Sequence, residues 1–284
     1  MANLKEIRAR ITSVGSTMQI TSAMKMVSAA KLKRAQDAIT QMRPYANKLN
    51  ELLVNLSSTL DTSEGGVYSQ AREVKSILIV AVTSNRGLCG AFNNNVIKGS
   101  KTLAEGYEHA AFVTIGKKAS EHFTKNGYDV IASHDVLYND LTFANTSAIA
   151  QDLMNHFVEG RYDKVVVVYN QFKNAASQNL MTEAYLPVEA PADDIATISE
   201  YIFEPEKAEI VAELIPKSLK VQLFKAVLDS HASEHGARMT AMHKATDNAG
   251  ELKRELTLTY NKARQAAITG EILEIVGGAE ALNG

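Results

Sequence analysis

The chain has 284 residues, 45% of them hydrophobic and 22% charged, which is typical of a globular protein with a buried core. Its apolar runs are about seven residues long, whereas a membrane-spanning helix needs roughly 20, so we expect no direct membrane insertion. Charged residues also stand where a signal peptide would be apolar. Cys89 is the one cysteine, which excludes an internal disulfide and favours a reducing compartment.

Charge is distributed unevenly, although the formal net charge is only −2. Residues 1–48 contain nine Lys or Arg against two Asp or Glu, whereas residues 183–213 contain nine acidic residues and one basic residue. This segregation predicts different surroundings for the two regions. For the basic region, the residues alone leave three possibilities open: a nucleic-acid arm, a surface facing an acidic protein, or a solvated helix face.

The N-terminal region has apolar residues at alternating spacings of three and four, which predicts a long helix with one apolar stripe. Polar residues interrupt the stripe at Thr21, Lys25 and Ser28. Pro44 lies off the stripe and predicts a bend or the loss of one backbone hydrogen bond, not necessarily the end of the helix. The stripe consists of Leu4, Ile7, Ile11, Val14, Met18, Leu32, Ala35, Ile39, Met42, Ala46, Leu49, Leu53, Leu56 and Leu60.

The C-terminal region repeats this heptad pattern, with a polar gap at His231, His235 and Arg238 and a possible start or kink at Pro216. Two such helices at opposite ends of one chain predict an antiparallel coiled coil. The second stripe consists of Val221, Phe224, Leu228, Met242, Ala245, Ala249, Leu252, Leu256, Ala263, Ala266 and Leu273.

Between these regions, short apolar runs alternate with helical patterns, which predicts a small parallel or mixed sheet covered by helices. The expected strands are 77–82, 111–115, 128–131, 165–169 and 180–186, and the expected helices are 95–106, 118–126 and 146–159. Residues 61–75 and 191–200 read as loops. The predicted fold class is therefore α/β: a long antiparallel coiled coil with an inserted Rossmann-like domain, divided as 1–60, 61–205 and 206–284.

The segments that could carry chemistry do not complete a known site. The turn after the first strand contains Gly87 and Gly90 but lacks the third glycine of a dinucleotide fingerprint, and the sequence has no phosphate-binding loop. His231 and His235 with Glu234 match a His-x-x-Glu-His zinc pattern, yet they lie within a long heptad helix, where a polar break in the stripe explains them. We therefore expect no cofactor, no metal and no catalytic residue.

Cys89 follows Arg86 at a predicted helix start, where a thiol can have a lowered pKa. No sequence signature supplies the histidine partner that a catalytic thiol needs. Cys89 is therefore interpreted as a small residue in a tight strand-to-helix turn.

Several longer strings resemble the gamma subunit of bacterial F-type ATP synthases. They occur in the order of that family and extend over nearly the whole chain, with the most specific matches at the two ends. These strings are Ile20–Lys31, Arg43–Tyr45, Arg86–Gly90, Ala245–Ala249, Tyr260–Thr269 and Glu271–Ile275.

The resemblance implies a non-catalytic rotor shaft, present in one copy inside a ring of three alpha and three beta subunits. It would also contact the epsilon subunit and the membrane ring of c subunits, at the cytoplasmic face of the bacterial inner membrane. Turning the shaft would couple ion flow through the c ring to ATP synthesis or hydrolysis at the beta subunits. A nucleic-acid-binding coiled coil or a zinc hydrolase would not explain the ordered strings.

The resemblance also assigns contacts. It places Met24, Lys25, Arg86 and Cys89 near acidic loops of beta, Arg264, Gln265 and Thr269 against the upper ring, and Tyr201 and Glu204 toward epsilon and the c ring. The sequence departs from the family pattern at Asn85, where aspartate is common, and at Gly15 and Gly270, where polar residues are usual. A helix-interior glycine costs about 1 kcal/mol relative to alanine, so we expect softer helices there.

Overall fold

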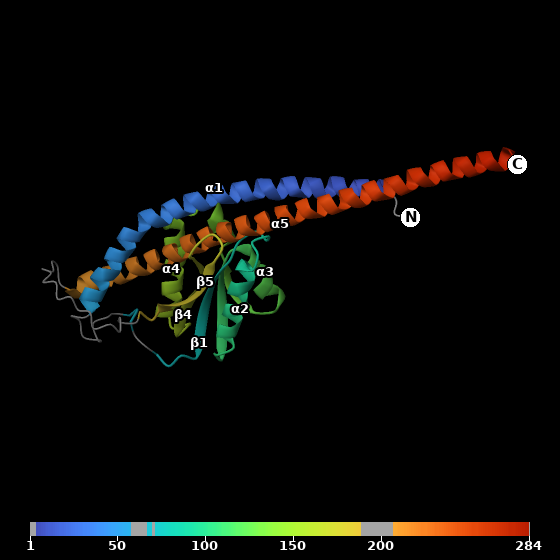
Figure 1. Ribbon diagram of the computed structural model, residues 1–284. Coiled ribbons are helices and arrows are strands. Elements are labelled where there is room, and N and C mark those ends of the chain that lie inside the picture. Colours follow the sequence, from blue (N-terminus) through green and yellow to red (C-terminus); the bar gives the residue numbers. More distant parts are fainter. Residues whose placement is uncertain (1–3, 58–66, 70–71, 189–206, 284) are drawn as a thin grey trace. The chain divides into compact units, whose positions relative to one another are not determined.

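The computed structural model describes residues 4–57, 67–69, 72–188 and 207–283 (Figure 1). The chain divides into two compact units. The first unit combines Met1–Ser28 with Met239–Gly284, and the second is Ala29–Arg238. Within the described ranges, no helix has the length and apolar character needed to cross a membrane.

Two long helices contribute to both units: α1 (Leu4–Ser57, 54 residues) and α5 (Lys207–Asn283, 77 residues). Both contain an internal proline, Pro44 in α1 and Pro216 in α5, and neither helix ends there. A proline removes one backbone hydrogen bond from a helix, which neighbouring turns of such long helices tolerate. The prediction of one long helix at each end of the chain is confirmed.

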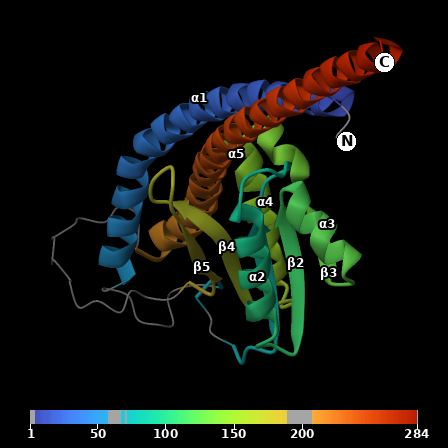
Figure 2. The same ribbon diagram turned by 45° about the vertical axis from the view of Figure 1, so that its right-hand side comes forward.

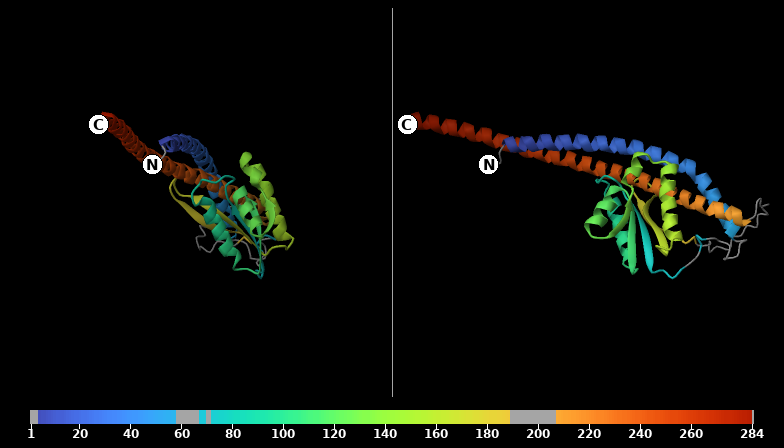
Figure 3. Two further views of the ribbon diagram at one scale, coloured as in Figure 1. Left: turned by 90° about the vertical axis from the view of Figure 1, so that its right-hand side faces the viewer. Right: turned by 180° about the vertical axis from the view of Figure 1, so that it is seen from behind.

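In the first unit, α1 and α5 lie side by side and antiparallel, with α5 continuing beyond the start of α1 (Figures 1 and 3). Three close approaches show that the helices are antiparallel, because the residue number of the contacting α5 residue decreases as that of the α1 residue increases. A Cβ added at Gly15 would lie 3.7 Å from Lys253 Nζ, one added at Gly250 would lie 3.9 Å from Met18 Sδ, and Thr246 Oγ1 lies 2.8 Å from Thr21 Oγ1.

The predicted apolar stripe of α1 is confirmed where its side chains are described, and it continues through the polar residues that were expected to interrupt it. Thr21 and Ser28 are buried, and each hydroxyl donates to a backbone carbonyl four residues earlier, Thr17 or Met24. Lys25 is half-buried at the same register. A short hydroxyl residue can therefore occupy the stripe because its own helix satisfies its hydrogen bond.

The predicted stripe of α5 is half right. The column Met242, Ala249, Leu256 and Ala263 is buried or half-buried as expected. The second column is half-buried as expected at Phe224 and Ala245 but wrong from Leu252 onward, since Leu252 and Leu273 are 46% and 65% exposed and Ala266 is exposed as well. The half-buried residues one position later take that place: Thr246, Lys253, Tyr260 and Ala267. Small side chains and the long lysine stem fit here, and the apolar character of leucine misled the assignment.

The second unit contains a five-stranded sheet in the order β3-β2-β1-β4-β5. The strands β1, β2, β3 and β4 are parallel, and β5 pairs antiparallel with β4 along the edge. Their bounds are β1 Ser76–Val82, β2 His109–Ile115, β3 Asp129–Ser133, β4 Lys164–Phe172 and β5 Gln178–Leu186. All five predicted strands and the α/β class are confirmed.

Helices cover both faces of the sheet (Figure 2). On one face, Ile77 and Ile79 of β1 pack with α2 (Phe92–Ala104) and α3 (Lys117–Lys125). On the other face, Leu78 of β1 packs with α4 (Phe143–Val158) and with α5 residues such as Leu223. The nearly continuous apolar strands follow from this double covering. The three predicted helices are confirmed; the short 3-10 helix η1 (Asp135–Asn139) was not predicted.

Candidate interaction sites

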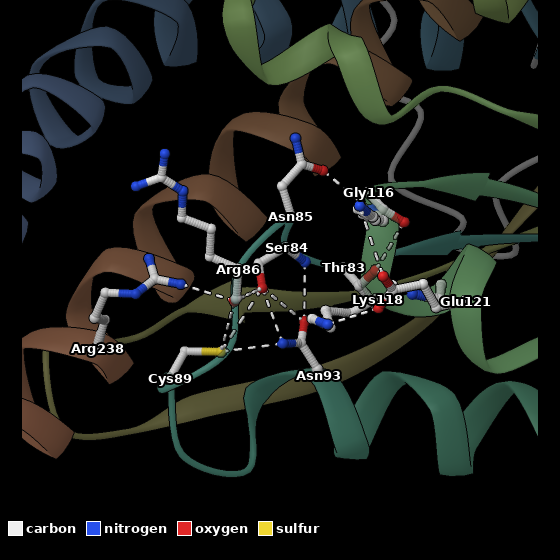
Figure 4. Close-up of polar contacts among 12 residues, drawn as sticks. Thr83, Ser84, Asn85, Arg86, Cys89, Asn93, Gly116, Lys118, Glu121 and Arg238 are labelled. Atoms are coloured by element: carbon white, nitrogen blue, oxygen red, sulfur yellow. Dashed lines mark hydrogen bonds and ion pairs between the residues drawn. The ribbon is translucent and has the colours of Figure 1, made fainter.

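The turn after β1 lies where ligands usually bind in open α/β sheets, because the strand order reverses direction beside β1. Its polar groups are paired within the turn and with α2 (Figure 4). The Ser84 hydroxyl donates to the Arg86 carbonyl at 2.6 Å, and the Ser84 amide donates to Asn93 Oδ1 at 2.9 Å. Asn93 Nδ2 in turn lies 3.2 Å from Cys89 Sγ. The polar side chains of this turn therefore brace its backbone.

Thr83 and Gly116 bring the ends of β1 and β2 into close contact. Thr83 Oγ1 accepts a hydrogen bond from the Ala119 amide at 2.9 Å, in the first turn of α3. Gly116 has φ +100°, and an added Cβ would lie only 2.1 Å from the Thr83 carbonyl oxygen. Glycine is thus required at 116 for both conformation and space.

Asn85 joins three loops at the same edge of the sheet. Its Oδ1 accepts from the Lys117 amide at 3.0 Å, and its Nδ2 donates to the Asp135 carbonyl at 2.6 Å. An ionised aspartate could accept the first bond but could not donate the second. The departure from the family pattern at this position therefore gives the chain one additional link to η1.

Arg238 clamps the turn after β1 to α5. Its Nη2 donates to the carbonyl oxygen of Arg86 at 3.0 Å (Figure 4) and to that of Gly87 at 3.2 Å. Its Nη1 forms an ion pair with Glu234 one helical turn earlier. Both side chains are buried. Burial raises the pKa of the Glu234 carboxyl, while the charge and hydrogen bond of Arg238 act against that rise. Sequence reasoning placed Arg238 in a polar gap and missed this clamp.

Cys89 is only 1% exposed, and burial raises the pKa of its thiol. The Ser84 hydroxyl and the Arg238 charge lower it by smaller amounts. A nucleophilic cysteine needs the opposite arrangement, an accessible thiol with a lowered pKa. The geometry therefore favours the interpretation of Cys89 as a small packing residue in the turn.

His231 and His235 lie one turn apart on α5, with their Nε2 atoms 3.1 Å apart. Among the residues that the model describes, no group of three or more His, Cys, Asp or Glu is arranged to hold a metal ion. His231 stacks instead on Tyr138 of η1, with ring centroids 5.7 Å apart. The polar gap in the predicted stripe thus faces the α/β domain.

The predicted contact residues differ in exposure. Arg86, Arg264, Gln265 and Thr269 are exposed, Met24 and Lys25 are half-buried, and Cys89 is buried. Arg86 and Cys89 belong to one turn, whereas Arg264, Gln265 and Thr269 lie within about one and a half turns of α5. Tyr201 and Glu204, and the loop expected at 191–200, lie outside the described residues.

Two exposed apolar features were missed by the sequence reasoning. Leu88, at the tip of the turn after β1, is 65% exposed and has φ +64°. The last part of α5 also exposes a set of large apolar side chains. The heptad pattern did not reveal this, because it either assigned these residues to the buried stripe or left them out. They are Ile268, Ile272, Leu273, Ile275 and Val276.

Comparison with known proteins gives consistent results over the full length. A family model described as "ATP synthase" matches residues 3–282. The chain is 63% identical to the ATP synthase gamma chain of Flavobacterium johnsoniae, with 100% of both chains covered. It is 47% identical to the ATP synthase gamma chain of Chlorobaculum tepidum, with 99% of both covered.

Solved structures agree on the fold. The chain resembles the central stalk/c-ring structure of Tetrahymena thermophila mitochondrial ATP synthase, with a TM-score of 0.62, 25% identity, and 80% of this chain and 99% of the other covered. It also resembles a chain of the Euglena gracilis mitochondrial ATP synthase rotor, with a TM-score of 0.69, 22% identity, and coverages of 93% and 98%.

Proposed function

Because the chain belongs to the ATP synthase gamma-chain family, we propose that it is the central rotor shaft of an F-type ATP synthase. One copy stands inside a ring of three alpha and three beta subunits and turns with the c ring. Its rotation couples ion flow through the membrane to ATP synthesis or hydrolysis at sites on the beta subunits. The observation that carries this proposal is the family match over the whole chain.

The antiparallel pairing of α1 and α5 in the first unit supports a shaft. An isolated helix has little resistance to bending, and a second helix packed along it adds side-chain contacts that any bend must disturb. The pairing has a defined register, from Gly15 beside Lys253 to Thr21 beside Thr246. Such a pair can transmit torque between partners bound at its two ends.

The end of α5 supports contact with the alpha and beta ring. Its exposed side chains from Ile268 to Val276 form an apolar surface of the kind that marks protein interaction sites. We place this surface in the upper ring, where apolar surroundings would cover it. Arg264, Gln265 and Thr269 lie exposed at its start and would supply the directional polar contacts.

The basic part of α1 and the turn after β1 are proposed to face acidic loops of beta. Met24 and Lys25 lie on α1, and Arg86 is exposed on the turn. Cys89 would act indirectly: its side chain is buried, so it supports the turn that carries Arg86 and Leu88. Opposite charges on the two surfaces would guide the approach and suppress wrong pairings.

The chain itself is proposed to be non-catalytic and to need no cofactor or metal. At the edge of the sheet where α/β proteins bind nucleotides, Ser84, Asn85 and Asn93 are engaged in internal hydrogen bonds. Arg238 is likewise engaged by Glu234 and the turn carbonyls. A phosphate arriving here would have to break these contacts before gaining its own.

The lower contacts and the domain boundaries extend the proposal. Tyr201 and Glu204 are assigned to the epsilon subunit and the c ring, which places the chain peripherally at the cytoplasmic face of the bacterial inner membrane. The functional parts are the shaft helices 1–60 and 206–284 and the inserted domain 61–205.

Native purification tests the proposal. Mass measurement of the intact complex should give three alpha, three beta, one epsilon and one copy of this chain, together with c subunits. The chain purified alone should neither hydrolyse ATP nor bind it tightly. Turnover that copurifies with this chain in the absence of beta would contradict the proposed role. Metal analysis should give no zinc; one zinc per chain that is lost in His231→Ala would overturn the account of the histidine pair.

A further inference from the structure

The histidine pair of α5 is the one close contact between two imidazoles given by the structure, and the shaft function does not use it. His231 Nε2 and His235 Nε2 are 3.1 Å apart, and the rings meet edge to face with centroids 4.6 Å apart. At this distance one nitrogen must donate and the other must accept, so the contact needs at least one neutral imidazole. Two protonated rings would present two N–H donors and two positive charges to each other.

The pair lies where α5 meets the α/β domain. His235 is 5% exposed, and His231 stacks on Tyr138 of η1 with an angle of 18° between the ring planes. Two buried polar atoms nearby, Ser233 Oγ and His235 Nδ1, have no hydrogen-bond partner among the described residues. Unpaired buried polar groups weaken a contact, so this part of the interface is held mainly by packing of uncharged rings.

The charged groups around the pair are contributed by two other segments and by α5 itself. Lys31 of α1 and Arg238 of α5 act on both histidines, and each disfavours a further positive charge. Glu234 is the nearby carboxyl, and it is engaged by Arg238 and also influenced by Lys31 and by Arg86 of the turn after β1. Tyr138 of η1 supplies no charge. Protonation of the pair is therefore opposed from several sides.

We propose that His231 and His235 form an acid-sensitive latch, which holds η1 of the α/β domain against α5 and releases it when the pair takes up protons. The latch would let a falling internal pH loosen the domain from the helix.

The sign of the effect follows from the pKa of each ring. Burial lowers the pKa of His231 to about 4, with smaller effects of Lys31 and Arg238, and burial together with the charge of His231 lowers that of His235 to about 3. An exposed histidine has a pKa of about 6.5. Above that pH the two imidazoles are unprotonated in both the closed and the open state of the latch, and the latch is closed. As the pH falls below it, the open state gains protons first, so the closed state loses stability.

Two nearby carboxyls act in the opposite sense and must be separated from the pair. Burial raises the pKa of both Glu234 and Asp229, and such groups lose protons on exposure. Asp229 interacts with Lys225, Arg43 and Glu183 rather than with the histidines. The contribution of the latch is therefore measured as a difference between the wild type and variants that lack the imidazoles.

Cys89 supplies the readout, because it is the single cysteine of the chain and is 1% exposed. The turn that contains Cys89 is held to α5 by Arg238, which lies on α5 one helical turn after Glu234 and donates to the Arg86 carbonyl. Asn85 of the same turn donates to the Asp135 carbonyl of η1 at 2.6 Å, so release of η1 is expected to loosen this turn and expose the thiol. The full chain is reacted with a dithiodipyridine reagent from pH 7.5 to 5.5, and each rate is divided by the rate of the urea-unfolded chain at the same pH. That division removes the ionisation of the thiol itself.

The variants are His231→Gln, His235→Gln and the double variant, since glutamine keeps a polar side chain that does not titrate. The matched control is His243→Gln on the same helix, an exposed histidine paired with Asp247 at 3.3 Å. Circular dichroism at each pH monitors the helices in parallel.

From pH 7.5 to 5.5 each imidazole should increase opening about tenfold. The relative labelling rate of the wild type should therefore rise about 100-fold more than that of the double variant, and each single variant should lie between them. His243→Gln should match the wild type. Equal pH dependence in the wild type and the variants would overturn the latch, as would loss of helical signal over the same range, which would indicate unfolding of the whole chain. If the double variant does not fold, the two single variants decide.

Discussion

Thr246 of α5 and Thr21 of α1 share a hydrogen bond of 2.8 Å between their hydroxyl oxygens, inside the stripe along which the two helices pair. Thr21 also lies 3.0 Å from the carbonyl oxygen of Thr17 in its own helix. Thr21 can thus donate to Thr17 and accept from Thr246. One polar pair therefore helps to fix the register of the two helices.

The threonine pair predicts a non-additive result. Thr21→Val and Thr246→Val should each cost about 1 kcal/mol in unfolding free energy, because each removes the hydrogen bond between the helices and leaves the remaining hydroxyl only the carbonyl of its own helix, Thr17 or Met242. The double variant should cost less than the sum, since valine replaces both polar groups with the same shape. Urea unfolding of the four proteins measures the coupling, and strictly additive costs would show that the hydroxyls do not interact.

The register of α5 predicts different tolerance at two leucines. Leu256 is half-buried in the paired stripe, whereas Leu252 is 46% exposed. Leu256→Ala should lower the unfolding free energy by about 1–2 kcal/mol, and Leu252→Ala should change it by less than about 0.5 kcal/mol. Thermal or urea unfolding distinguishes them, and a larger loss at 252 would restore the register expected from the sequence.

A proline at position 252 tests the stiffness of the proposed shaft. Leu252→Pro removes a backbone hydrogen bond and clashes with the preceding turn, at a cost of about 3 kcal/mol or more. Membranes carrying it should retain some ATP hydrolysis while ATP-driven ion pumping and ion-driven ATP synthesis fall sharply. Since the leucine is exposed, Leu252→Ile and Leu252→Ala are both controls that should remain coupled. Wild-type pumping per ATP in an assembled proline variant would make a rigid helix pair through this position untenable.

Arg264 and Gln265 are exposed on α5, so their removal should spare the chain and weaken its complex. Each charged hydrogen bond that they form with the ring is expected to contribute about 1.5–3 kcal/mol. Arg264→Ala with Gln265→Ala should therefore reduce assembly or turnover several-fold, while the melting of the isolated chain stays unchanged. Normal assembly together with a normal ATPase rate would identify both residues as ordinary helix surface.

Replacing Asp229 with a side chain that does not ionise should stabilise the chain in a pH-dependent way. Its carboxyl is 4% exposed, Oδ1 has no hydrogen-bond partner, and burial raises its pKa to about 6. The raised pKa means that stability is fully present below about pH 4 and is lost as the pH rises through 6. Asp229→Asn should thus stabilise the chain by about 2–3 kcal/mol at pH 8 and by about half as much at pH 5. Urea unfolding at the two pH values tests this, and an equal effect at both would exclude titration as its cause.

The α/β domain could be predicted from the sequence because its strands are buried on both faces. The run from Ile77 to Val82 has no polar residue, and the lengths of the apolar segments separate strands from the helices between them. Only η1 was missed, since a single short turn has no periodicity to detect.

The register of α5 and the details of the candidate sites could not be predicted in the same way. Leucine at 252 and lysine at 253 suggest the wrong face, because hydrophobicity alone does not account for a lysine stem that packs beside Gly15. The clamp between Arg238 and Arg86 joins residues 152 positions apart. Nothing in the sequence around either residue indicates that it contacts the other, because the two meet only in the folded chain.

The pairing of α1 with α5 also sets the order in which the chain can acquire its structure during synthesis. Thr21 and Thr246 are 225 positions apart, whereas β1 pairs with β2 across a much shorter segment that includes only α2. Contacts that are close in sequence form early, and distant ones wait for the intervening chain. The α/β domain can therefore fold on the ribosome while the amphipathic α1 has no partner. A ribosome that stalls before codon 239 leaves the part of that stripe in the first unit, up to Ser28, uncovered, so we expect incomplete chains to become substrates for chaperones and proteases.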